Sequence, residues 1–187
     1  MISTTQDLMV RTEADFDRLP EDGVFEVVDG RAILSPGNDP MHQDISGALF
    51  LAFQRQLKAL GYGYVVQAVN VFLPPPRGSV GEIQNRVPDL VVSRRPPKDR
   101  FRANEPPELV IEILATPRGN VERTEKMDDY ARAGIAEYWI VNPFARLIEV
   151  YLLRDGDYVR QPAPVPLRPH GFPGVAIDPA EIWAVLD

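Results

Sequence analysis

Two short apolar runs, each interrupted by an acid, constrain the fold of this chain more than any other feature. Residues 87–92 contain Asp89, and residues 108–114, which begin with Glu108, contain Glu112 among apolar residues. Both runs are rich in Val, Ile and Leu, which is typical of strands buried on both faces. An acid in such a strand is costly unless it is paired or holds a cation. An exposed loop between the runs would let the two acids lie side by side, where a hard divalent cation would remove their repulsion.

The length of 187 residues predicts one domain, residues 1–187, with its core at about 21–160. No apolar run is long enough for a transmembrane helix. Residues 1–10 lack the basic and apolar segments of a secretory signal, and the chain has no cysteine. These features together favour a cytoplasmic protein without a membrane partner.

The charge and the missing motifs exclude several classes of function. A net charge of −7 argues against a passive, non-specific nucleic-acid binder, because such proteins are usually basic. It argues less against an enzyme that meets a phosphodiester through a bound metal. The chain has no Gly-rich phosphate loop, no Gly-x-Ser-x-Gly and no His-Glu-x-x-His. Two histidines and no cysteine also argue against a zinc site.

Hydrophobic periodicity and turn residues predict the order of the elements. In chain order we expect a short helix at 12–19, a hairpin at 25–34, a helix at about 45–60, a long strand at 62–73, a loop to about 86, the first acidic strand at 87–92, a loop at 93–107, the second acidic strand at 108–115, a helix at 120–133, a strand at 137–141, a hairpin at 147–161 and a last helix at 179–186. The fold class is therefore α/β, a mixed sheet whose core order is helix, strand, strand, strand, helix, strand, with a β-hairpin added at each end.

Several segments, in this order and spacing, resemble the PD-(D/E)XK nuclease superfamily, and within it the bacterial putative restriction endonuclease family. The matching pieces are Phe-Glu-Val-Val-Asp-Gly at 25–30, His42, Pro-Asp-Leu at 88–90, Glu-Leu-Val-Ile-Glu-Ile-Leu at 108–114, Lys126 with Tyr130, and Gly-Ile-Ala-Glu-Tyr-Trp-Ile-Val at 134–141. The resemblance implies a restriction-endonuclease-like core and a metal-dependent DNA endonuclease that hydrolyses phosphodiester bonds.

The resemblance also implies roles for three residues. Asp89 and Glu112 would hold Mg²⁺, with Mn²⁺ as a possible substitute, and a lysine would assist the attacking water. The superfamily lysine usually lies two positions after the second acid, where this chain has Leu114. Lys126 on the following helix is the candidate replacement. The alternative is a catalytically inactive nuclease fold that serves as an interaction or regulatory module, which Leu114 and the acidic net charge favour.

Each of these residues also has a purely structural interpretation. Asp89 is otherwise a strand-edge residue after a proline, and Glu112 a buried acid paired with an arginine. Lys126 is otherwise the surface partner of Glu122, four residues earlier on the same helix. Glu26 either faces the site as a further acid or points outward from its hairpin.

A histidine and a basic cluster are the remaining candidate site residues. His42 either contacts phosphate or shuttles a proton, or it is a surface residue before the long helix. The only basic cluster joins the two acidic strands and offers candidate contacts to the DNA backbone, unless it is a solvated loop; its members are Arg94, Arg95, Lys98, Arg100 and Arg102. A homodimer or higher homo-oligomer is expected, because cleaving two strands suits two-fold symmetry.

Overall fold

The computed structural model describes residues 8–35, 37, 39–102, 104–117 and 120–187. Its helices are α1 (Glu13–Phe16), α2 (Pro40–Leu60), α3 (Asn120–Arg132) and α4 (Pro179–Trp183), with a 3₁₀ turn at Ala184–Leu186. Its strands are β1 (Phe25–Val28), β2 (Arg31–Leu34), β3 (Tyr64–Gln67), β4 (Val71–Leu73), β5 (Gln84–Arg86), β6 (Leu90–Ser93), β7 (Phe101–Arg102), β8 (Leu109–Ile113), β9 (Glu137–Asn142), β10 (Leu147–Arg154) and β11 (Asp157–Gln161). The predicted mixed α/β fold class is confirmed.

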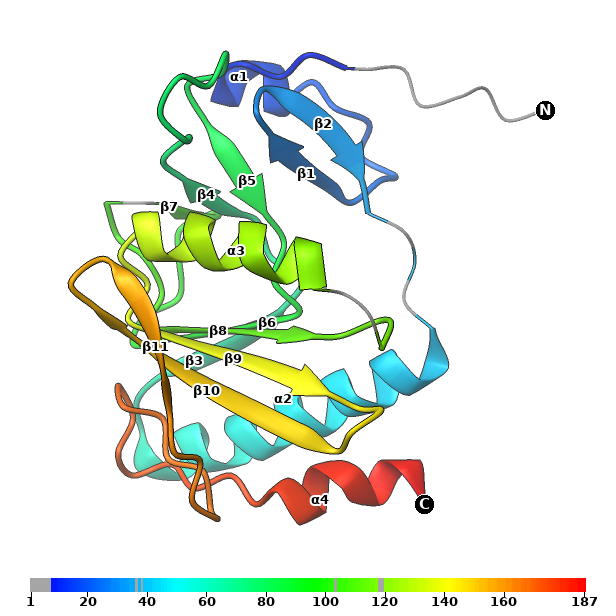
Figure 1. Cartoon of the computed structure of the whole chain (residues 1–187), viewed down its shortest axis with the longest axis vertical. Coiled ribbons are helices and arrows are strands. Elements are labelled where there is room, and N and C mark those ends of the chain that lie inside the picture. Colours follow the sequence, from blue (N-terminus) through cyan, green and yellow to red (C-terminus); the bar gives the residue numbers. More distant parts are fainter. Residues whose placement is uncertain (1–7, 36, 38, 103, 118–119) are drawn as a thin grey trace.

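The larger sheet has the strand order β11-β10-β9-β8-β6-β3. β8 and β9 are parallel and the other neighbours are antiparallel. Every residue of β6 and β8 is buried, which explains why both sequences read as apolar runs. Helices α2 and α4 cover one face of this sheet, and α3 lies on the other (Figure 1). The hairpin of β10 and β11 extends the sheet beyond β9, as the C-terminal hairpin was predicted to do.

The smaller sheet corrects the prediction of a single sheet. Its order is β2-β1-β5-β4-β7, and it contains the predicted N-terminal hairpin. The strand predicted at 62–73 is divided into β3, which joins the larger sheet, and β4, which joins the smaller one. The chain turns between them at Ala68, whose φ is +49°. The segments predicted as loops before residue 86 and at 93–107 contain β5 and β7.

The turn and cap residues account for the ends of the main elements. Asp29 and Gly30 have φ of +48° and +73°, the conformation that the predicted tight turn between β1 and β2 requires. Gly61 ends α2 in the left-handed conformation, also as predicted. α2 begins earlier than the prediction of about 45, because Asp39 caps its N-terminus and Pro40 takes its first position.

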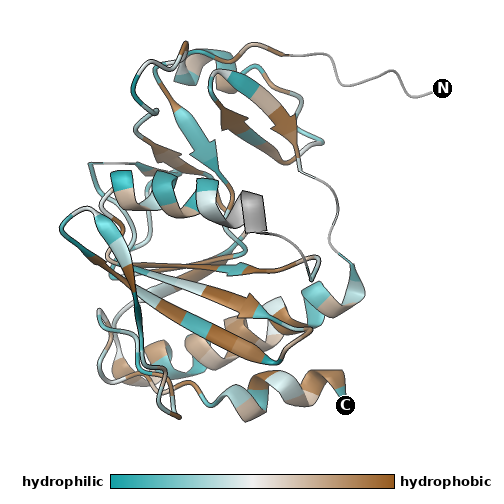
Figure 2. Ribbon diagram, in the orientation of Figure 1, coloured by the Kyte–Doolittle hydropathy of each residue, from teal (hydrophilic) through white to brown (hydrophobic). Residues whose placement is uncertain are grey.

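The two sheets meet around α3, which lies between them in Figure 1. Apolar residues are frequent along the strands of the larger sheet, whereas β5 is hydrophilic over its length (Figure 2). All three residues of β5 are nevertheless buried. Polar groups therefore fill the space between the smaller sheet and α3. Within the described residues, no helix has the length and apolar character needed to span a membrane.

Candidate active site

Asp89 lies immediately before β6, because the strand predicted at 87–92 begins only at Leu90. Leu90 pairs with Ile111 of β8, so Asp89 and Glu112 occupy the next matching positions. The Oδ2 atom of Asp89 accepts a hydrogen bond from the backbone N–H of Ile113 at 2.7 Å. The structure thus brings the two acids together, as the sequence predicted.

Glu112 is buried, with 7% of its surface exposed. Its Oε1 atom accepts a hydrogen bond from the hydroxyl of Tyr130 at 2.5 Å and lies 3.1 Å from Nζ of Lys126. Burial raises the pKa of Glu112 to about 7. Lys126 opposes this shift, while the negative charges of Asp89 and Glu26 reinforce it. Burial also raises the pKa of Tyr130 well above its usual value, so its hydroxyl stays a donor.

Lys126 projects from α3 toward both sheets and is 8% exposed. Its Nζ lies between Oε1 of Glu112 and Oε1 of Glu26, which is 3.4 Å away. The structure therefore brings this lysine to the acids despite its distance from them in the sequence. The side chain of Glu122, its alternative partner, lies outside the described part of the chain.

Glu26 faces the acids from β1 of the smaller sheet, so of its two interpretations the inward one holds. Its Oε2 atom lies 2.9 Å from Nη1 of Arg86, and its Oε1 atom accepts a hydrogen bond from the backbone N–H of Val87 at 3.3 Å. Arg86 also reaches α3, where its Nε lies 2.7 Å from Oδ2 of Asp129. The charges of Glu26 and Asp129 outweigh the burial of Arg86 and raise the pKa of this guanidinium.

Arg86, Asp129 and Tyr130 are site residues whose roles the sequence did not reveal. Arg86 ends the polar strand β5, which carries no hydrophobic pattern, and Asp129 looks like an ordinary helical acid. The one available signal was spacing: Asp129 and Tyr130 follow Lys126 by three and four residues, so all three share a helix face.

His42 is the third residue of α2 and 3% exposed, which corrects the alternative of a surface residue before the helix. Its Nε2 lies 3.1 Å from Oδ2 of Asp89. Burial opposes protonation of His42, but the hydrogen bond and charge of Asp89 outweigh it and raise its pKa. Its Nδ1 atom is buried, and no described residue hydrogen bonds to it.

The donor set of this cluster fits a hard cation that needs few protein ligands. Among the described residues, no group of three or more His, Cys, Asp or Glu side chains is arranged to hold a metal ion. No described residue hydrogen bonds to Oδ1 of Asp89 or Oε2 of Glu112, so each acid keeps one oxygen free. Mg²⁺ is commonly bound by one or two carboxylates, together with waters and substrate phosphates.

The basic cluster lies away from the two acids, and its contact with DNA stays a prediction. It follows β6 at the end opposite to Asp89, about 13 Å along the strand. Arg94 pairs with Glu108, and Arg100 and Arg102 both pair with Asp99. With Arg95 and Lys98 they line a cavity of about 420 Å³.

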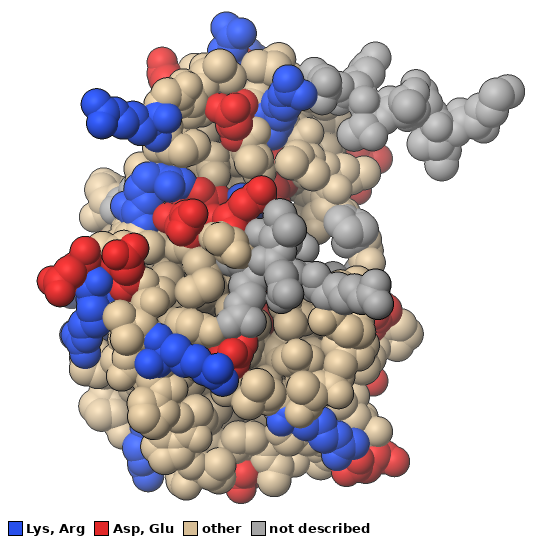
Figure 3. Space-filling model, in the orientation of Figure 1, with Lys and Arg blue, Asp and Glu red and all other residues tan. Residues whose placement is uncertain are grey.

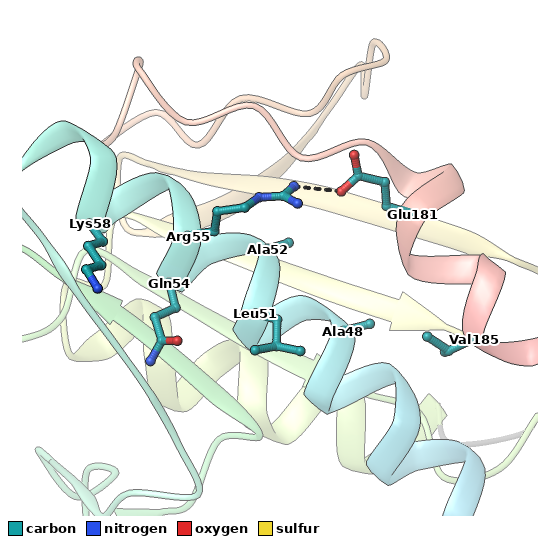
Figure 4. A pocket seen from close by; sticks show the side chains of 8 residues that line it. All are labelled: Ala48, Leu51, Ala52, Gln54, Arg55, Lys58, Glu181 and Val185. Atoms are coloured by element: carbon teal, nitrogen blue, oxygen red, sulfur yellow. Dashed lines mark hydrogen bonds and ion pairs between the residues drawn. The ribbon is translucent and has the colours of Figure 1, made fainter.

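Two other surface features lie apart from the acids. Figure 3 shows acidic side chains gathered over α3 on one face of the molecule. Figure 4 shows a hollow of about 380 Å³ between α2 and α4, bounded by the ion pair of Arg55 with Glu181. Leu51, which lines it, is 62% exposed, and the lining contains none of the candidate site residues.

A solved structure and a family model both match this chain. The chain resembles the crystal structure of a putative nuclease belonging to DUF820 from Anabaena variabilis, with a TM-score of 0.71 and 18% identity over 94% of this chain and 99% of that one. At that identity the likeness concerns the fold alone. No curated protein matches. The model of the Uma2 family, described as "Putative restriction endonuclease", matches residues 13–180. Since this match spans most of the sequence, the chain belongs to the Uma2 family.

Proposed function

We propose that this protein is a metal-dependent DNA endonuclease that hydrolyses phosphodiester bonds, with Mg²⁺ as its ion and Mn²⁺ as a substitute. The observation that carries the proposal is that Asp89, immediately before β6, Glu112 of β8 and Lys126 of α3 lie in one cluster. Each acid keeps one oxygen free of hydrogen bonds from described residues, and a lysine that is hardly exposed lies beside the second acid. Membership of the Uma2 family supports the same activity.

The proposed ligands are Oδ1 of Asp89 and Oε2 of Glu112, joined by the backbone carbonyl of Ile113. A divalent ion held by these oxygens would supply a Lewis acid for the phosphate and would lower the pKa of a bound water. The surrounding residues orient both acids. His42 and the backbone N–H of Ile113 fix the opposite oxygen of Asp89, while Tyr130 fixes that of Glu112.

Lys126 is the residue that we propose stabilises charge during the reaction. Its ammonium lies 3.1 Å from Glu112, where it donates to the attacking water or to the negative charge that develops on the phosphate. Since α3 supplies this lysine, Leu114 at the usual lysine position does not by itself remove the activity. Glu26 holds the ammonium from its other side at 3.4 Å.

The test is a cleavage assay on supercoiled plasmid and on single-stranded DNA, in Mg²⁺, Mn²⁺ or EDTA. We expect metal-dependent cleavage that Asp89→Ala abolishes. Asp157→Ala, which changes an exposed aspartate of β11, is the matched control and should cleave like the parent protein. Cleavage that persists in Asp89→Ala with an unchanged requirement for metal would contradict the assignment.

The rival function, an inactive nuclease fold kept for interaction or regulation, predicts a different result in calorimetry. An active site binds Mn²⁺ with an affinity that Asp89→Ala removes, whereas a degenerate site has no such affinity to lose. The proposed organisation is a single domain in a homodimer or a higher homo-oligomer. Sedimentation of the protein, alone and with DNA, tests the subunit number.

A further inference from the structure

We propose that Arg86 is a positioning residue that keeps Lys126 directed at Glu112. This inference rests on the proposed function, because it assigns a task to a residue behind the candidate catalytic lysine. Arg86 lies on β5, is 4% exposed, and touches neither Asp89 nor Glu112 through any hydrogen bond or ion pair among the described residues. Any effect of Arg86 on the reaction must therefore act through its two carboxylate partners, Glu26 and Asp129.

One of those partners lies beside Lys126, and the other lies on the helix that carries it. Glu26 receives Nη1 of Arg86 on Oε2 at 2.9 Å and lies beside the lysine ammonium through Oε1. Asp129 receives Nε of Arg86 on Oδ2 at 2.7 Å and lies three residues after Lys126, about one turn along the same face of α3. One guanidinium therefore fixes both the acid beside the lysine and the helix that carries it.

A second residue of β5 reinforces this link between α3 and the smaller sheet. Gln84, two residues before Arg86 on the same face of β5, donates to Oδ2 of Asp129 at 2.6 Å. Arg132 pairs with Oδ1 from the more exposed side. β5 thus presents two adjacent donors to one acid of α3, which explains why a strand with no apolar pattern is buried.

Charge explains why an arginine is needed at this position. Glu26 would otherwise be a largely buried carboxylate whose nearest cation is Lys126. Since an unpaired buried charge is costly, it would draw the lysine ammonium away from Glu112. Arg86 satisfies Oε2 of Glu26, and Lys126 then lies closer to Glu112, at 3.1 Å, than to Glu26, at 3.4 Å. A planar guanidinium can reach two carboxylates at once, which the single ammonium of a lysine does less well.

The kinetic test compares Arg86→Gln with the parent protein and repeats the change in a Lys126→Met background. We expect kcat to fall about 10- to 100-fold with little change in KM, since small displacements of a catalytic group cost rates of this order. In Lys126→Met the same change should cost less than about threefold, because the group that it positions is gone. An equal loss in both backgrounds would show that Arg86 acts on the fold alone and would overturn the proposal.

A second readout does not depend on activity. The chain has three lysines, of which Lys58 and Lys98 are exposed and serve as internal references. Acylation of Lys126 by an amine-reactive ester, followed by mass spectrometry, should become severalfold faster in Arg86→Gln. An unchanged rate would refute the positioning role, even if the parent protein cleaves no DNA. Absence of cleavage by the parent protein would instead count against the proposed function.

Two further variants serve as controls, one for the loss of an arginine beside Asp129 and one for the case that Arg86→Gln does not fold. Arg132→Gln removes the other arginine from Asp129 without touching Glu26 or Lys126 through any described contact, and both readouts should match the parent protein. If Arg86→Gln does not fold, Glu26→Gln combined with Arg86→Gln removes the unpaired carboxylate as well. With no carboxylate left to compete with Glu112, that protein should fold and keep Lys126 acylated at the parental rate; acylation severalfold faster than in the parent would show that Arg86 does not act through the charge of Glu26 and would overturn the proposal.

Discussion

The hydroxyl of Tyr130 and the ammonium of Lys126 both contact the same oxygen, Oε1 of Glu112, at 2.5 Å and 3.1 Å. Both donors come from the same face of α3, one turn apart. Their joint effect is to fix the carboxylate of Glu112 through one oxygen, which leaves Oε2 available for a cation. A similar division exists at Asp89, where Ile113 and His42 share Oδ2.

Tyr130→Phe should therefore weaken cation binding. The ring and its packing are retained, but Glu112 loses the donor that orients it, and losses of this kind typically reduce metal affinity by about 10- to 100-fold. Calorimetric titration with Mn²⁺ measures the change. Tyr158→Phe is the control, because the Tyr158 hydroxyl donates to the backbone carbonyl of Ile135 and not to either acid. Equal affinity in Tyr130→Phe and the parent protein would disprove an orienting role.

Lys126→Met should separate cation binding from catalysis. Removing an ammonium that lies 3.1 Å from Glu112 reduces the positive charge next to the proposed ion, so Mn²⁺ should bind at least as tightly as before. The cleavage rate should nevertheless fall about 10²- to 10³-fold, the usual cost of losing one donor to developing charge. Calorimetry and single-turnover cleavage measure the two quantities on the same sample. Loss of Mn²⁺ binding in this variant would mean that the lysine maintains the site and does not act in the reaction.

The acid pair could be predicted from the sequence because each acid interrupts an otherwise apolar strand. In such strands a carboxylate stands out against the hydrophobic pattern, and the chain order restricts which strands become neighbours. Lys126 was predicted from the family resemblance, on a helix that was predicted from its periodicity. For these residues, the local pattern agrees with their position in the fold.

Arg86 could not be found in this way. It lies on β5, where Gln84, Asn85 and Arg86 are all polar yet all buried. A hydropathy pattern reveals a buried strand only when the strand's side chains are apolar. The side chains of β5 are polar, and they are buried among hydrogen-bonding partners on β1 and α3. Those partners are distant in the sequence, so only the assembled fold reveals them.

The division of residues 64–73 between two sheets was missed for a related reason. Neither a glycine nor a proline marks the break, and Ala68 adopts a positive φ that sequence rules assign mainly to other residues. The early start of α2 had a usable signal, since Asp39 followed by Pro40 is a typical helix beginning. That signal would have placed His42 inside the first turn.

The basic cluster should affect DNA affinity without affecting the chemical step. Arg95 and Lys98 form no ion pair with a described residue, and the cluster lies at the end of β6 opposite to Asp89. Changing both to Ala should lower DNA affinity and reduce its dependence on log salt concentration by up to about two. The single-turnover rate at saturating DNA should stay the same. A reduced rate at saturation, with unchanged salt dependence, would show that the cluster acts on the reaction and not on the DNA backbone.

Glu137 provides a pH-dependent term in stability that is separate from the candidate site. Its side chain is buried on β9, where it accepts hydrogen bonds from the indole N–H of Trp139 at 2.7 Å and the backbone N–H of His170 at 2.6 Å. Burial raises its pKa above the usual value of 4.5, although both donors oppose the shift. Between pH 4.5 and the folded-state pKa, the folded protein therefore binds more protons than the unfolded chain.

The free energy of unfolding should consequently fall as the pH rises through this window, by about 1.4 kcal/mol for each unit of pKa difference. Glu137→Gln removes the titrating group, so the variant should lose this part of the pH dependence. Any change that the amide makes to the free energy of unfolding is the same at every pH and does not affect the comparison. Glu112 contributes in the same direction in both proteins and cancels from their difference. Urea unfolding in EDTA, from pH 4 to 8, provides the comparison. Parallel curves for the two proteins would show that the pKa of Glu137 is the same in the folded and unfolded states.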